Sequence, residues 1–197
     1  EFFMVRVAGL KQQILGGVSE SGADGLLPPE QLAAISARVH RMVEDQGRVW
    51  AEQIRPELEA AGVRLLEPRQ LSAEQRAAAR AHFVQNVFPA LTPLAVDPGH
   101  PFPHLRNKSL NVALLLSRAG RNEGRRRRRT APPEHAYAVV QVPAVLSRLV
   151  RLPSAADRDG RDHLLLGRLI AAHAGDLFPG YAVLDATAFR VTRNWDL

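Results

Sequence analysis

The chain has 197 residues, of which 46% are hydrophobic and 23% charged, and this balance predicts a folded protein with a core rather than a disordered chain. Its formal net charge is +6, carried almost entirely by arginine, which favours polyanionic partners such as phosphate polymers, nucleotides or nucleic acid. The run Arg125–Arg129 accounts for five of the positive charges, so one loop-like segment explains the excess equally well. No apolar run approaches the roughly 18 residues that cross a bilayer. The absence of cysteine excludes disulfides and thiolate chemistry, and it fits a protein of the reducing cytoplasm.

The N-terminal segment is predicted to form a helix. Apolar side chains recur at helical spacing over Phe2–Leu15, and Gly16-Gly17 is expected to end the helix. Segment 18–27 is rich in serine and glycine and is predicted to be a linker or a loop. The chain opens without an initiator methionine or the regions of a signal peptide, so we expect its start to be a cut in a longer sequence.

A second, longer helix is predicted from Pro28 to Ala60. Its apolar residues form one stripe, which predicts a helix packed along one side. The stripe consists of Leu32, Ile35, Val39, Met42, Val49, Trp50, Ile54 and Leu58. Trp50 is expected to belong to the core rather than to a stacking surface. Because Pro56 lacks a backbone donor and its ring clashes with the preceding turn, we expect a kink or a break near Arg55.

A short strand and a third helix are predicted after the expected stop at Gly62. The apolar segment Val63–Leu66 is predicted to be the strand. Ser72 followed by Gln75 has the spacing of a capping box, which predicts a helix that runs to about Phe88 and is closed by Pro89.

The sequence beyond Pro89 is typical of strands and turns. Four prolines predict extended or turning chain over Leu91–His104. Two Val- and Leu-rich strands, Ser109–Ser117 and Ala136–Val142, are expected to pair as a hairpin across an arginine-rich connection.

A helix and a final strand are predicted at the end of the chain. Helical spacing predicts the helix over Leu164–Ala174, with Gly175 as its stop. Alternation predicts the strand over Ala182–Asp196, and we expect Leu197 to interrupt it. The elements together predict an α+β fold that is helical at first and mixed afterwards.

The usual catalytic and nucleotide-binding motifs are absent from the sequence. It has no phosphate-binding loop ending in Gly-Lys-Ser/Thr, no Gly-x-Gly-x-x-Gly and no His-Glu-x-x-His. The serines lie outside any nucleophile-elbow context, which argues against a hydrolase. These are Ser36, Ser72, Ser109 and Ser147.

Two features have both a functional and a purely structural interpretation. His100 and His104, with Asp97 nearby, have the chemistry to bind a metal or move protons, but a proline-fixed loop whose histidines bond the backbone is the favoured interpretation. The run Arg125–Arg129 has the chemistry to grip phosphates, whereas a solvated insertion between two strands, held open by self-repulsion, is favoured.

Four further basic residues are expected at strand edges, where alternation presents several cations on one face. They are Arg106, Lys108, Arg190 and Arg193. Such a face is suited to lining the path of a polyanion, and ordinary surface charge explains the same residues equally well.

Three segments, in the same order, are similar to the polyphosphate kinase family that makes long-chain polyphosphate from ATP. Glu1–Lys11 resembles the family's Asn-Leu-Asp-Glu-Phe-Phe-x-Val-Arg segment without its first three residues. A second stretch of the family is similar to Leu91–Pro103, which runs into Asn107–Asn111. Leu177–Tyr181 followed by Phe189–Asn194 resembles the third. The arginine-rich insertion, residues 120–133, departs from the family's compact hairpin loop and receives no family role.

The resemblance implies a domain layout in which residues 1–62 are the later part of an N-terminal helical domain and residues 63–197 the earlier part of a head domain. It implies transfer of the terminal phosphate of ATP, with Mg²⁺, to polyphosphate through a phosphohistidine in C-terminal domains that the chain does not reach. None of the seven histidines matches that motif. We therefore assign no catalytic, cofactor-binding or metal-binding residue and expect the isolated chain to be inactive.

The expected contributions of this portion are cover on the nucleotide side of the active site and dimer contacts through the head domain. The expected partners are ATP, ADP, polyphosphate and a second copy of the protein, and we do not expect nucleic acid to be one of them. The alternative interpretation is a non-catalytic module that binds polyphosphate or nucleic acid through its arginines.

Overall fold

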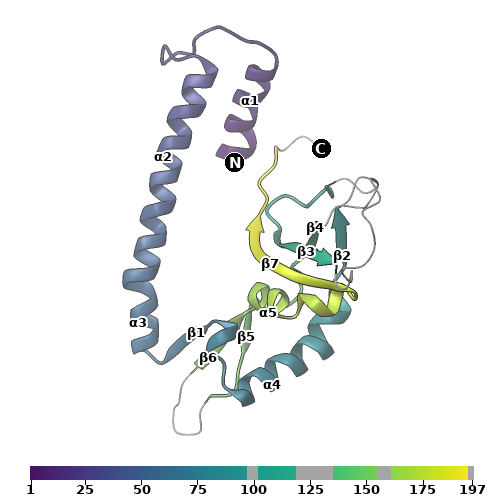
Figure 1. The fold of residues 1–197 in the computed structure, drawn as a ribbon. Helices are drawn as coiled ribbons and strands as arrows, with labels where there is room; N and C mark the ends of the chain where they lie inside the picture. The colour runs from purple at the N-terminus through teal and green to yellow at the C-terminus, as the bar shows by residue number, and fades with distance from the viewer. Residues whose placement is uncertain (97–101, 119–134, 155–160, 195–197) are drawn as a thin grey trace, which may run out of the picture. The chain divides into compact units, whose positions relative to one another are not determined.

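The computed structural model describes residues 1–96, 102–118, 135–154 and 161–194 (Figure 1). Its contacts divide the chain into two units, Glu1–Ala61 with Thr192–Leu197, and Gly62–Val191, and each unit is described by itself. Helices and two sheets are present, so the predicted α+β class is confirmed. Within the described ranges, no helix combines the length and the apolarity needed to cross a membrane.

The first unit is a pair of helices joined by a linker. A π-helical turn, η1 (Phe3–Val7), continues into α1 (Ala8–Leu15), and Gly17 follows with a φ of 71°, a conformation that glycine adopts without strain. After the linker, α2 (Pro28–Val49) begins at the predicted proline. Arg6 donates a 2.7 Å hydrogen bond from Nη2 to Gln31 Oε1, which connects the two helical segments.

Of the kink or break predicted near Arg55, the break does not occur. The π-helical turn η2 (Trp50–Ile54) connects α2 to α3 (Arg55–Ala60), and the backbone stays in the right-handed helical region at every junction. The amide of Arg55 donates to the carbonyl of Trp50, five residues earlier. This wider turn shifts the hydrogen-bond register just ahead of Pro56, so the helix continues past the missing donor.

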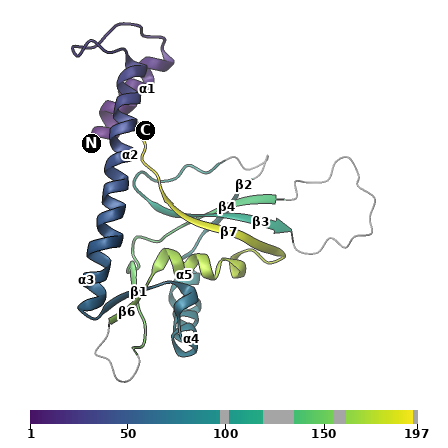
Figure 2. The ribbon, with the colours of Figure 1, turned by 60° about the vertical axis from the view of Figure 1, so that its left-hand side comes forward.

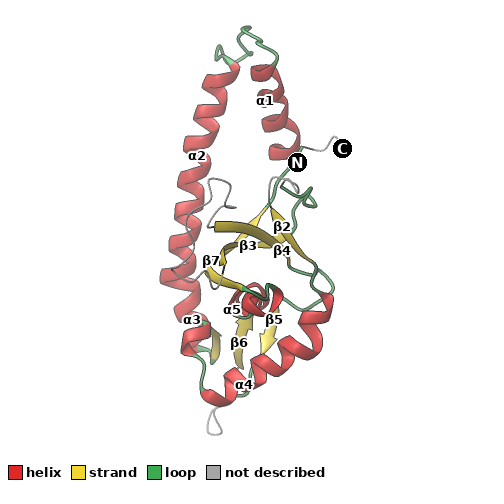
Figure 3. Cartoon of the chain, turned by 45° about the vertical axis from the view of Figure 1, so that its right-hand side comes forward, coloured by secondary structure: helices red, strands yellow, loops and turns green. Residues whose placement is uncertain are grey.

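The apolar stripe that runs along α2, η2 and α3 is only partly packed, which corrects the prediction of a helix packed along one side. Leu32, Ile35 and Val39 are half-buried, and Figure 3 shows α1 beside this end of α2. Further along, Met42 is 55% exposed and Trp50 is 41% exposed, so Trp50 is not a core residue in the described chain. The short α1 reaches only part of the stripe, which accounts for the difference.

The second unit contains two sheets. The three-stranded sheet has the order β1-β6-β5, with β1 (Val63–Leu66) parallel to β6 (Arg161–Leu165) and β5 (Leu149–Arg151) antiparallel to β6. The four-stranded sheet has the order β2-β4-β3-β7 and is antiparallel throughout. Its strands are β2 (Pro93–Val96), β3 (Leu110–Arg118), β4 (His135–Gln141) and β7 (Tyr181–Arg190).

Two helical segments of the second unit enclose its core. The first runs through η3 (Pro68–Gln70), α4 (Ala73–His82), η4 (Phe83–Val87) and η5 (Phe88–Ala90). The second is α5 (Leu166–Ala172) with η6 (Ala174–Leu177), and Figure 2 shows α5 along one face of the four-stranded sheet. The largest fully buried side chains here are Phe83, Leu114, Leu164, Leu166, Leu169 and Ile170.

Several predicted elements of this unit are confirmed and others need correction. The strand Val63–Leu66 and the hairpin of β3 with β4 are present. β5 and β6 were not predicted, because they are short and charged residues interrupt their apolar pattern. The helix predicted to begin at Leu164 begins at Leu166, since the preceding residues complete β6.

The last strand is shorter than predicted, and the expectation that Leu197 interrupts it is wrong. β7 ends at Arg190, and Thr192 to Asn194 are not in a strand. The reason lies in its partner strand: the chain before β3 turns at residues 106–109, so the pairing stops where the amide of Val191 donates to the carbonyl of Ser109.

The capping box of α4 leads to a stability prediction. The amide of Gln75 donates to Ser72 Oγ and the amide of Ser72 donates to Gln75 Oε1, both at 3.1 Å, as the sequence predicted. Ser72→Ala should lower the free energy of unfolding by about 1 kcal/mol, measured by urea denaturation. Ser72→Asn, which keeps an acceptor at the N-cap, should recover most of the loss. An equal loss in both variants would show that the cap does not stabilise the helix.

Candidate functional site

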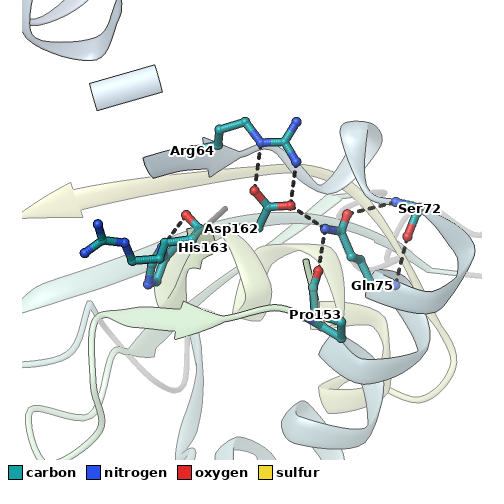
Figure 4. A network of polar contacts seen from close by, with 7 residues as sticks. Arg64, Ser72, Gln75, Pro153, Asp162 and His163 are labelled. Carbon is teal, nitrogen blue, oxygen red and sulfur yellow. Dashed lines mark hydrogen bonds and ion pairs between the residues drawn. The ribbon is translucent and has the colours of Figure 1, made fainter. Parts of the chain in front are cut away.

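A buried carboxylate lies at the centre of a polar network in the second unit (Figure 4). The side chain of Asp162, in β6, is completely buried. Arg64, in the neighbouring strand β1, donates from Nε to Oδ1 at 2.7 Å and from Nη2 to Oδ2 at 2.6 Å. The guanidinium therefore grips the carboxylate with two parallel hydrogen bonds, while its own side chain stays 37% exposed.

Gln75 connects this ion pair to α4. Its Nε2 donates to Asp162 Oδ2 at 2.8 Å and to the carbonyl of Pro153 at 2.9 Å, while its Oε1 accepts from the amide of Ser72. One amide side chain thus closes the N-terminus of α4 and helps to solvate the buried charge (Figure 4). The network joins β1, β6 and α4 at a single point.

The pKa of Asp162 is lowered, chiefly by the hydrogen bonds from Arg64. Burial opposes this shift, and the hydrogen bond from Gln75 and the charges of Arg64 and His163 add to it. A carboxylate held in its ionised form by donors at both oxygens is a poor base and a poor nucleophile. The arrangement therefore has a structural role. It could not be predicted from a local sequence pattern, because Arg64 and Asp162 lie 98 positions apart.

Asp162→Asn should test the strength of the network. The amide keeps the shape of the side chain but loses the ion pair, so the free energy of unfolding should fall by about 1.5–3 kcal/mol in urea denaturation at pH 7. The control is Asp45→Asn, because Asp45 pairs with Arg48 on an exposed helix face where each side chain is 63% exposed. Asp45→Asn should change the free energy of unfolding by less than about 0.5 kcal/mol. Similar losses in the two variants would contradict the assignment.

The same pair predicts a pH dependence. The pKa of Asp162 lies below the value of about 3.9 in an unfolded chain, so its contribution is fully present above that pH. The contribution is lost as the pH falls through the lowered pKa. The melting temperature should therefore drop below about pH 4, and it should drop less in Asp162→Asn than in the unaltered chain. An equal fall of the melting temperature with pH in both proteins would show that other carboxylates govern the loss of stability in acid.

The described histidines do not gather with other ligands into a metal centre. The ring of His173 stacks on Phe83 with centroids 4.8 Å apart, and Nδ1 of His163 lies 2.9 Å from the carbonyl of Arg161. His104 is exposed, whereas its proposed partners His100 and Asp97 lie outside the described residues. Among the residues the structure describes, no three His, Asp or Glu side chains come together to hold a metal ion.

The basic residues singled out from the sequence are partly brought together. Arg106 and Lys108 lie in the turn before β3, and Arg190 ends the adjacent strand β7. Arg193 belongs to the first unit, so it is not part of this group. Arg125–Arg129 lie outside the described residues, and their proposed role stays a prediction.

Each unit also has an apolar hollow on its surface. In the first unit, Val43, Val49, Trp50 and Ile54 line a hollow of about 610 Å³ beside Gly47 in α2 and η2. In the second unit, a hollow of about 390 Å³ has an apolar lining that includes Leu110, Val142, Leu166 and Ala188, and it also has the side chains of Arg148 and Arg168.

Comparisons with known proteins match the whole chain. The family model described as the polyphosphate kinase N-terminal domain matches residues 1–66, and the one described as the polyphosphate kinase middle domain matches residues 74–197. The chain is 40% identical over 200 residues to a polyphosphate kinase of Pseudomonas aeruginosa and 41% identical over 199 residues to one of Halalkalibacterium halodurans.

These relatives are much longer than the chain. Each alignment covers 100% of this sequence but only 27% of the Pseudomonas protein and 26% of the Halalkalibacterium protein. The crystal structure of a polyphosphate kinase from Porphyromonas gingivalis superposes with a TM-score of 0.79 and 27% sequence identity, over 100% of this chain and 27% of that one.

Proposed function

Because this chain belongs to the polyphosphate kinase family, we propose that it is a portion of an enzyme that transfers the terminal phosphate of ATP to polyphosphate. The observation that carries the proposal is the 40% identity to a polyphosphate kinase along the full length of the chain. The chain spans about a quarter of that relative, so the proposed activity is that of a longer protein.

In this proposal, residues 1–62 are the later part of the helical domain and residues 63–197 the earlier part of the head domain. The family models that match 1–66 and 74–197 support that division. The phosphate passes through a phosphohistidine that lies outside this chain. The absence of cysteine supports a cytoplasmic location for the protein. Nδ1 of His163 lies against a backbone carbonyl and the ring of His173 stacks on Phe83, and the proposal gives neither residue a role as phosphate acceptor.

ATP and Mg²⁺ serve the complete enzyme. Mg²⁺ is usually held by one or two carboxylates together with water and substrate phosphates, and the proposal assigns no Mg²⁺ ligand to this chain. The contribution of the chain is to supply folded surfaces: cover on the nucleotide side from the helical domain and dimer contacts from the head domain. The exposed apolar residues Trp50, Leu149 and Leu184 are of the kind that such contacts bury.

An ATP-to-polyphosphate assay tests the proposal. The 197-residue chain and the complete reading frame that contains it would be incubated separately with labelled ATP, Mg²⁺ and a polyphosphate primer. Only the longer protein should incorporate label into polymer. Incorporation by the chain alone would overturn its assignment as a non-catalytic portion, and inactivity of both would favour a module that binds polyanions without turnover.

A further inference from the structure

The turn that precedes β3 has a strained backbone. Arg106 to Ser109 form a β-turn, in which the amide of Ser109 donates to the carbonyl of Arg106 at 3.1 Å. Within it, Lys108 has a φ of 61° and is the only non-glycine residue in the described chain with a positive φ. Residues with a Cβ avoid this region unless their surroundings impose it, and such residues gather at functional sites.

Hydrogen bonds from three sides hold the turn in place. The amide of Lys108 donates to the carbonyl of Val191 at 2.8 Å, and Ser109 Oγ donates to the carbonyl of Arg106 at 2.6 Å. Arg190 Nε donates to the carbonyl of Lys108 at 3.1 Å. The strained residue and the last residue of β7 are therefore fixed against each other.

Asn111 supports the turn from the protein interior. Its side chain is completely buried, and Nδ2 donates to the carbonyl and the hydroxyl of Ser109 at 3.1 and 3.0 Å. Because this buried amide donates to two acceptors of the same residue, it holds the backbone of Ser109 in place at the end of the turn. The turn is thus pre-organised rather than a loose surface loop.

The turn carries uncompensated positive charge. Arg106, Lys108 and Arg190 are all exposed, and none forms an ion pair with a carboxylate in the described part of the chain. The bond that fixes Arg190 uses only Nε, which leaves its two Nη groups for another acceptor. Three cations held by one turn and one strand end repel each other, and an anion with several charges relieves that repulsion.

We propose that Arg106, Lys108 and Arg190 form a binding site for consecutive phosphate groups of a polyphosphate chain. Guanidinium and ammonium groups on a rigid backbone suit phosphate oxygens, and a strained turn that holds them spares the ligand the cost of ordering them. The choice of polyphosphate over nucleic acid rests on the proposed function.

Binding of a polyphosphate of defined length to the 197-residue chain, measured by titration calorimetry without ATP at several salt concentrations, tests the site. Lys108→Gly and Arg190→Gln should each weaken binding by about 3- to 10-fold, and the double variant by more. Each should also reduce the slope of log affinity against log salt by about 0.7. Arg151→Gln removes an equal charge from the exposed end of β5 and should change affinity by less than about twofold.

Lys108→Gly also separates binding from folding. Glycine adopts the observed φ without strain, so the melting temperature should be kept while affinity falls. Undetectable binding by the unaltered chain, or equal losses in the control variant, would overturn the site. Tighter binding of a single-stranded DNA of equal charge would also overturn it in favour of a nucleic-acid site. Because the assay contains no ATP, a negative binding result would overturn the site without contradicting the proposed phosphate transfer.

Discussion

The fold of the second unit depends on how one buried charge is solvated. Asp162 has lost all contact with water, and an ionised carboxylate in that position is tolerated only when protein donors replace the water. Arg64 and Gln75 provide those donors from β1 and α4. The register of β1 against β6 and the first turn of α4 are therefore coupled, because a shift of either element would leave the charge without partners. Apolar packing alone tolerates small slips, whereas a bidentate ion pair does not.

Much of the fold could be predicted because it follows from local patterns. Helical periodicity, the Ser72 capping box and the alternation of β3 are all encoded within a few residues of sequence. β5 and β6 could not be predicted, since they are short and a charged residue takes a core position in β6. The continuation of the helix through Pro56, from α2 across η2 into α3, was also missed, because the π turn that accommodates the proline has no sequence signal of its own.

The candidate binding site was predictable only in part. Alternation singled out Lys108 and Arg190 among four basic residues at strand edges, with ordinary surface charge as an equal alternative. The pairing of β3 with β7 brings the two residues together. The left-handed conformation of Lys108 was not predictable, because lysine gives no hint of a positive φ where glycine or asparagine would. The role of Asn111 was hidden as well, since an asparagine in a strand is usually interpreted as a solvent-facing residue.

The parallel pairing of β1 with β6 sets the order in which the second unit folds. Residues 63 to 66 leave the ribosome about a hundred positions before their partners at 161 to 164, as the separation of 98 between Arg64 and Asp162 shows. The hairpin of β3 and β4 closes a much shorter loop, so it forms first, and β1 remains unpaired until nearly the whole unit has been synthesised. During that interval its backbone groups are open to pairing with other chains, so β1 is exposed to misassembly.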